Sequence, residues 1–272
     1  MALLDEGFCS DFWLRLGGVK GFVDGSLGSG TALMFAPYDD APGTAGLLAD
    51  QMYPAGIMHK RIAAADKAGV PVSVHAIGDK ANHLLLDLFE AVIKENGPRD
   101  RRFRIEHAQH LRPEDIVRMR RLGILASVQP GHVYEDGCWA EKRIGERRCL
   151  MAYAFRSLID ARVAVSFGTD WPVVPLNPFL GIYAAVTRQV QDGRYPAGWV
   201  PEQKLSVLEC LQAYTSGGAY AEFSETVKGT LKPGKLADLI LISQDVLIAQ
   251  PDDIPKTRVL CTIAGGKIVY QE

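Results

Sequence analysis

The sequence predicts an α/β fold in which parallel strands alternate with helices, as in part of a (β/α)8 barrel. The first observation is that short apolar runs alternate with stretches of helical periodicity, from about residue 18 to residue 190. The second is that each run carries a side chain able to hold or face a metal at or near its carboxyl end, which is the rim where such barrels keep their chemistry. The runs are 18–22, 72–75, 104–107, 125–129 and 165–170, and the side chains are Lys20, His75, His107, Gln129 with His132 just beyond it, and Asp170.

The first half of the alternation has clear boundaries. A β-branched run at 70–75 follows a glycine and predicts a buried strand. Apolar residues at helical spacing predict a helix over 80–94, which Asn96-Gly97-Pro98 ends. Residues 103–107 are the next predicted strand.

The second half repeats the pattern. Pro113 opens a predicted helix and Gly123 closes it. A strand at 124–129 ends at Pro130-Gly131, and a further strand is expected at 162–167. Helices are expected at 150–161, 178–191 and 206–221.

Five strands are three fewer than a closed barrel needs, and the barrel alone typically takes ~250 residues. Either the sheet is open, or three strands belong to sequence outside this chain; the second interpretation is favoured. The tail has a different pattern, with short strands expected at 237–242, 259–263 and 267–270 and a hairpin at Gly265-Gly266. We therefore expect a partial barrel over 1–225 and a small β appendage over 226–272.

Composition limits the function. Apolar residues make up 47% of the 272, charged residues 23%, and the net charge is -2, as in an ordinary soluble globular protein. No nucleic-acid or membrane partner is expected, because no basic excess and no apolar run of ~18 residues is present. The N-terminus lacks a basic signal-peptide region, and the cysteines are unpaired in pattern, so a reducing, cytoplasmic location is expected. They are Cys9, Cys138, Cys149, Cys210 and Cys261.

His75 and His107 are the first candidate ligands. Either one alone is as readily a hydrogen-bonded core histidine. Both, however, end neighbouring predicted strands at the same edge, and neutral imidazole is the commonest ligand of zinc. Together they favour a metal site.

Asp170 and Lys20 have two interpretations each. Asp170 precedes Trp171-Pro172 and either forms a turn, or binds a metal and takes a proton from water that the metal has acidified. Lys20 either reaches to solvent from an edge strand, or reacts with carbon dioxide to give a carbamate able to bridge two ions. Burial would favour that reaction by lowering the lysine pKa.

The loop at 24–30 is rich in glycine but has neither the Walker lysine nor a G-x-G-x-x-G order. A flexible active-site loop is favoured over a phosphate site, and an open α/β fold binding a nucleotide would depend on this loop alone. His132 lies just past a strand end, so substrate contact is expected there. His110 either supports a ligand or is solvated, and Asp79 is expected to cap the next helix.

These residues in this order resemble the metal-dependent amidohydrolase superfamily, and within it amidohydrolase family 3, which includes N-substituted formamide deformylase-like enzymes. The resemblance covers nearly the whole chain. Its stretches are 19–29, 74–79 (Val74-His75-Ala76-Ile77-Gly78-Asp79), 105–109, 127–132, 168–172 (Gly168-Thr169-Asp170-Trp171-Pro172) and 229–239.

The resemblance implies strands four to eight of a (β/α)8 TIM barrel, with the C-terminal strands of a small composite β-sandwich. It implies hydrolysis of a non-peptide carbon–nitrogen bond, of amide or formamide type, by a metal-activated hydroxide. A divalent metal, zinc first, would be bound as one or two ions by Lys20, His75, His107 and Asp170, with Lys20 carbamylated. Asp170 would also act as general base, and His132 would contact a small amide-type substrate.

The sequence departs from the family in having no His-x-His pair, which the first barrel strand of the family supplies. Strands one to three are therefore expected to be missing, and this polypeptide alone is expected to have little or no hydrolase activity. The alternatives are a catalytically inactive remnant, or a metal-binding chain that pairs with another chain, either a second copy or the missing N-terminal half.

Overall fold

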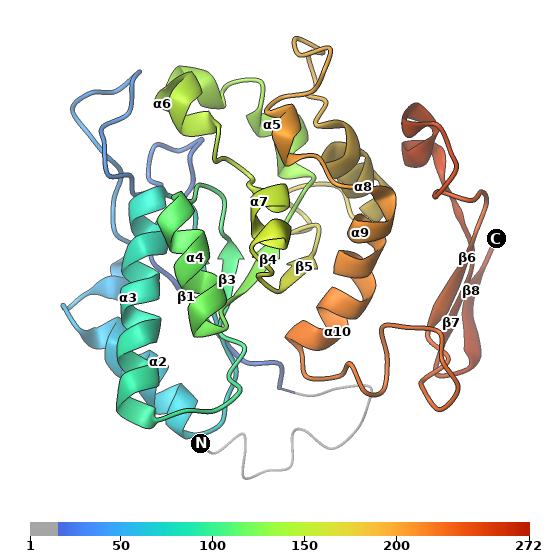
Figure 1. Ribbon diagram of the computed structural model, residues 1–272, viewed down its shortest axis with the longest axis horizontal. Helices are drawn as coiled ribbons and strands as arrows, with labels where there is room; N and C mark the ends of the chain where they lie inside the picture. Colours follow the sequence, from blue (N-terminus) through green and yellow to red (C-terminus); the bar gives the residue numbers. More distant parts are fainter. Residues whose placement is uncertain (1–15) are drawn as a thin grey trace.

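A computed structural model describes residues 16–272 of the chain. Its main sheet has five parallel strands in the order β1-β2-β3-β4-β5, with helices packed against it (Figure 1). Each strand therefore lies beside the one that precedes it in the chain. The strands are β1 Val19–Phe22, β2 Val72–Ala76, β3 Arg104–His107, β4 Leu125–Val128 and β5 Val165–Phe167.

The strand order never reverses, which separates this sheet from a doubly wound one, whose order changes direction at a switch point. Right-handed crossovers that always advance one place put the connecting helices on a single face, as in a barrel. The predicted alternation is confirmed. The helices are α2 Ile57–Lys67, α3 Asp79–Asn96, α4 Pro113–Leu122, α5 His132–Asp136, α6 Ala140–Cys149, α7 Phe155–Asp160, α8 Pro178–Thr187, α9 Val207–Gln212 and α10 Gly218–Ala221.

Local sequence signals set several of the boundaries. Pro113 is the first residue of α4, and Gly123 ends that helix with a left-handed φ of 67°. Ser206 and Glu209 form a capping box at the start of α9. The predicted helix 150–161 was too long: only α7 forms, because Ala152 forms a β-bridge with His110 instead.

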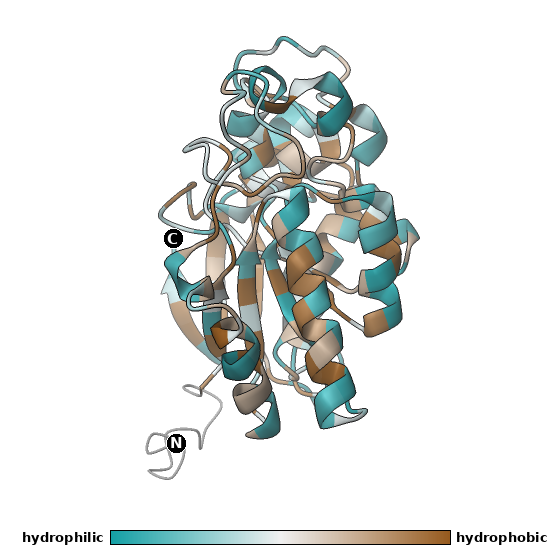
Figure 2. Cartoon of the chain, turned by 90° about the vertical axis from the view of Figure 1, so that its left-hand side faces the viewer, coloured by the Kyte–Doolittle hydropathy of each residue, from teal (hydrophilic) through white to brown (hydrophobic). Residues whose placement is uncertain are grey.

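The two faces of the main sheet differ in composition. Val72, Val74 and Ala76 of β2 point toward the helices and are almost fully buried. Figure 2 shows the helices on this side with hydrophilic and hydrophobic stretches side by side, and much brown in the strands behind them. The opposite, inner face carries mainly polar side chains: Lys20, Ser73, His75, Arg104, Glu106, Ser127 and Ser166.

A second sheet, antiparallel and of three strands, lies apart from the first at the C-terminal end (Figure 1). Gly265 and Gly266 connect its last two strands with positive φ at both positions, so the predicted hairpin is confirmed. Its strands are β6 Leu239–Ile242, β7 Val259–Ala264 and β8 Lys267–Gln271. Between β6 and β7 in the chain, the 3₁₀ helix η4 (Pro251–Lys256) packs on α8, and Ile254 belongs to the main core. The domain boundary at 225/226 stays a prediction.

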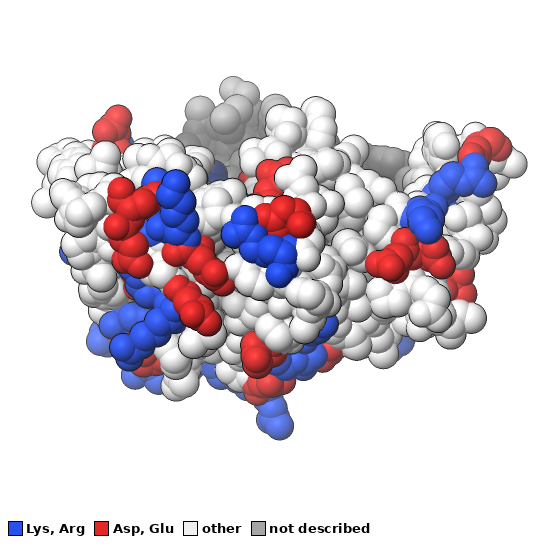
Figure 3. Space-filling model, turned by 90° about the horizontal axis from the view of Figure 1, so that it is seen from above, with Lys and Arg blue, Asp and Glu red and all other residues white. Residues whose placement is uncertain are grey.

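The surface has no large region of one charge in the view of Figure 3, where acidic and basic groups are intermixed. Among the helices of residues 16–272, none has the length and apolar character to cross a bilayer.

Candidate metal centre

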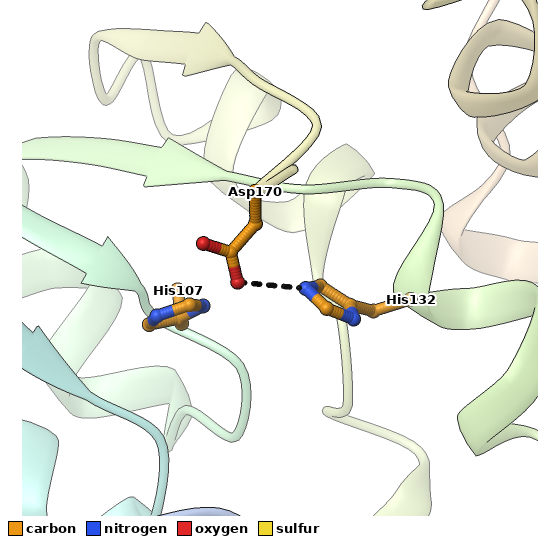
Figure 4. A group of neighbouring side chains, drawn as sticks. All are labelled: His107, His132 and Asp170. Atoms are coloured by element: carbon orange, nitrogen blue, oxygen red, sulfur yellow. Dashed lines mark hydrogen bonds and ion pairs between the residues drawn. The ribbon is translucent and has the colours of Figure 1, made fainter. Parts of the chain in front are cut away.

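Three side chains converge beyond the carboxyl ends of β3, β4 and β5 (Figure 4). His107, His132 and Asp170 each offer a ligand atom, and these atoms all lie within 4.8 Å of one another. The His132 Nε2 and an Asp170 Oδ2 are 3.3 Å apart. Two imidazoles and a carboxylate are the donors that zinc and similar ions prefer.

The backbone is unusual at two of these positions. Strand alternation would put His107 on the same face as the fully buried Ile105, toward the helices. His107 instead has a φ of 75°, and its ring lies 4.5 Å from that of His75, which belongs to the inner face. Asp170 has a φ of 63°. Such conformations cost about 1–3 kcal/mol each in non-glycine residues and concentrate at functional sites.

His75 adjoins the cluster without belonging to it. Its Nε2 lies 3.0 Å from the carbonyl oxygen of Gly25 and donates to it. The donated proton fixes the tautomer, so Nδ1 keeps the lone pair that can bind an ion. Burial, with the charge of Lys20 acting in the same direction, lowers the pKa of His75 and keeps it neutral.

The electrostatics of His107 suit a metal ligand. Burial, reinforced by the charges of His75, His132 and Lys20, lowers its pKa to about 3, so the ring is neutral near pH 7. Its Nδ1 is buried and has no hydrogen-bond partner among the described residues. A buried nitrogen without a partner is costly, and a cation is one ligand that would satisfy it. The residues present therefore fit a single divalent ion.

Lys20 lies lower than the sequence suggested. It was expected at or near the carboxyl end of its strand; β1 continues to Phe22, and Lys20 pairs with Ser73, two residues before His75. Its long side chain still reaches upward, because Nζ lies 5.2 Å from the centre of the Phe22 ring. Lys20 is exposed in the described structure, so the burial that would favour a carbamate is not present there.

Asp24 is a site residue to which the sequence analysis gave no role. It is 2% exposed and accepts backbone N–H groups of Leu33, Ile77 and Gly78 at 2.8–3.0 Å. Its Oδ1 also lies 3.5 Å from the Nε2 of His75. Burial raises the pKa of Asp24 to about 7. Asp24 therefore ties the glycine-rich loop to the β2–α3 connection.

Two other expectations need correction. His110 is buried, and neither ring nitrogen has a partner in the described part of the chain, so the solvated interpretation was wrong. Asp79 is the first residue of α3, not its cap; its side chain accepts the N–H of Phe35 at 2.9 Å.

The geometry groups the predicted residues differently from the resemblance. His132, expected to contact substrate, instead places a ligand atom within 4.8 Å of those of His107 and Asp170. His75 does not belong to this three-residue cluster. The role of each individual residue stays a prediction.

Comparison with known proteins gives concordant relatives. The chain is 42% identical over 268 residues to Protein LONG AFTER FAR-RED 3 of Arabidopsis thaliana, a match that covers 98% of this chain and 45% of that protein. It is 28% identical over 215 residues to the N-substituted formamide deformylase of Arthrobacter pascens, covering 79% and 39%. An uncharacterised metal-dependent hydrolase of Pyrococcus horikoshii OT3 superposes with a TM-score of 0.81 and 33% identity, covering 92% of this chain and 50% of that structure.

The chain thus spans about half the length of the relatives it matches. Its five-stranded sheet and small antiparallel sheet correspond to the C-terminal half of amidohydrolase TIM-barrel structures, as the sequence predicted. The sequence pattern of the amidohydrolase family matches residues 7–270. With the strand-end cluster in place, these observations show that the chain belongs to the amidohydrolase family, in its family 3 branch.

Proposed function

We propose that this site serves the metal-dependent hydrolysis of a carbon–nitrogen bond in a small linear amide of formamide type. The observation that carries the proposal is the convergence of His107, His132 and Asp170 within 4.8 Å at the rim of the sheet. Family membership supports the reaction class, and the relative named N-substituted formamide deformylase supports the type of bond.

His107, His132 and Asp170 would hold the ion, with zinc as first choice, and His75 would add a donor from Nδ1. A divalent ion there would lower the pKa of a water molecule and polarise the carbonyl oxygen of the substrate. Asp170 is the base in reach: its carboxylate would take a proton from water and pass it to the departing nitrogen. The neutral rings of His75 and His107 add no cation to compete with the ion.

The reaction balances with water alone. The carbonyl carbon–nitrogen bond breaks, a carbon–oxygen bond to the water oxygen forms, and both water protons end on nitrogen. The products are a carboxylate and an ammonium ion.

The test is a zinc titration of the metal-free chain followed by an assay of formate release from N-benzylformamide. We expect about one ion per chain, and binding lost in His107→Ala and in Asp170→Asn but kept in His59→Ala, whose ring pairs with Glu95 away from the rim. If His107→Ala bound zinc with wild-type affinity, the proposed metal site would be refuted.

A second candidate is a metal-binding chain without turnover, either an inactive remnant or one that needs a completing chain. It is supported by the chain's span of about half of its relatives. Zinc binding with no formate release would favour it. Zinc-dependent release by the chain alone would refute it.

A further inference from the structure

A cavity of about 450 Å³ adjoins the metal centre, between α5, α8 and η4. Gly131 and Thr169, which belong to its wall, immediately precede His132 and Asp170 in the chain. The volume is within the range of small-molecule sites in proteins. The wall consists of Gly131, Tyr134, Glu135, Thr169, Val174, Pro175, Asn177, Leu180, Gly181, Tyr183, Tyr214, Asp252 and Pro255.

The interior of the cavity is apolar and aromatic. Val174 and Leu180 provide aliphatic surface, and the rings of Tyr134, Tyr183 and Tyr214 provide aromatic surface. Gly181 allows Tyr214 its position, because a Cβ there would lie 2.1 Å from the tyrosine hydroxyl oxygen. This part of the wall suits an aryl or alkyl group.

The charge of the wall has one sign. Glu135 and Asp252 are exposed carboxylates, and the wall contains no lysine, arginine or histidine. No salt bridge to either carboxylate is found among the described residues. Asp252 reaches the cavity from η4, so the C-terminal segment contributes to a wall that the barrel strands alone would not complete.

Aromatic faces combined with carboxylates are the recognition elements for organic cations. The hydrolysis proposed above releases such a cation, since the departing nitrogen leaves as ammonium. We propose that this cavity holds the amine half of the substrate, an aralkyl or alkyl group on nitrogen, and excludes groups that end in an anion. This inference rests on the proposed function for the identity of its ligand.

The experiment measures binding of three aromatic probes of similar size to the metal-free chain by calorimetry: benzylamine as its ammonium ion, neutral benzyl alcohol, and benzoate. We expect benzylamine to bind about tenfold more tightly than benzoate, with benzyl alcohol between them. The double variant Glu135→Gln/Asp252→Asn should bring all three within about threefold. The matched double variant Asp50→Asn/Glu95→Gln removes the same charge outside the cavity wall and should leave the ratio unchanged.

Leu180→Trp should fill the cavity and abolish binding of every probe, with Val174→Phe as a second filling variant if the first unfolds. Equal binding of benzylamine and benzoate, no binding of any probe, or unchanged binding in the filled variants would overturn the inference. A parallel zinc titration separates the two proposals. Amine binding without zinc binding would refute the proposed function and leave the cation-selective cavity standing. Zinc binding without amine binding would refute the cavity proposal alone.

Discussion

The two faces of the five-stranded sheet have different roles, although the same strands form both. On the helix-covered face, Val74 and Ile105 are at most 1% exposed and belong to one continuous core. On the inner face, their sequence neighbours Ser73, His75 and Glu106 are polar. Alternation along a strand thus separates side chains that stabilise the fold from those that can carry chemistry.

The inner face is polar even where it is buried: Ser73, His75 and Ser166 are only 5–8% exposed. Among the described residues β1 and β5 are not paired with each other, so this sheet is open, and an apolar inner face would leave an exposed patch prone to association. Here Ser73 donates to Glu106, and Arg104 lies 3.6 Å from the same carboxylate. A polar network that water can also solvate is tolerated without closure.

The largest effect should come from the helix-covered face. Ile105→Ala removes a fully buried side chain and should lower the free energy of unfolding by about 2–5 kcal/mol, because it leaves a cavity. Ser127→Ala on the inner face should cost less than about 1 kcal/mol. Urea denaturation of the two variants measures the contrast, and equal losses would erase the distinction between the faces.

Asp24 lies where the first strand passes into the rim loop. The stability lost on its substitution should fall between the losses for Ile105→Ala and Ser127→Ala. Asp24→Ala leaves three buried N–H groups without their acceptor and should cost about 1–3 kcal/mol at pH 6. Asp50→Asn, an exposed acid, is the control and should be near neutral. Thermal unfolding reports the loss; a stable Asp24→Ala chain would mean that water replaces the carboxylate.

The pH dependence of the free energy of unfolding tests the lowered pKa of His107 at the rim. The pKa of His107 is about 3 in the folded chain against about 6.5 unfolded, so its contribution is complete above pH 6.5 and is lost as pH falls toward 3. Relative to His107→Asn, the metal-free wild type should lose at most ~1.4 kcal/mol per pH unit over that range. Parallel stability curves for the two chains would show that the ring titrates normally.

The smallest effect concerns the strained backbone at Asp170. With φ at 63°, Asp170→Gly should be about 1 kcal/mol more stable than Asp170→Ala, because glycine adopts this conformation without a Cβ clash. Both should lose zinc binding, since both lack the carboxylate. If alanine were the more stable, the left-handed conformation would not be a constraint at this position.

The sequence by itself determined the alternating fold class and which strands end near His75, His107 and Asp170. The signals used were local: period-two and period-3.6 patterns, prolines at helix starts and glycines at helix ends. Local signals can be read directly from the sequence. The family resemblance came from the same short stretches.

Only the tertiary structure decided which of these side chains meet. Strand alternation would have directed His107 to the helices. The left-handed backbone that redirects it contains no glycine, so nothing in the sequence signals it. The carboxylate of Asp24 finds its three N–H partners in two separate loops, and Asp252 reaches the cavity from a segment over 80 positions beyond Asp170. Contacts between distant segments depend on register and packing, which no single stretch of sequence encodes.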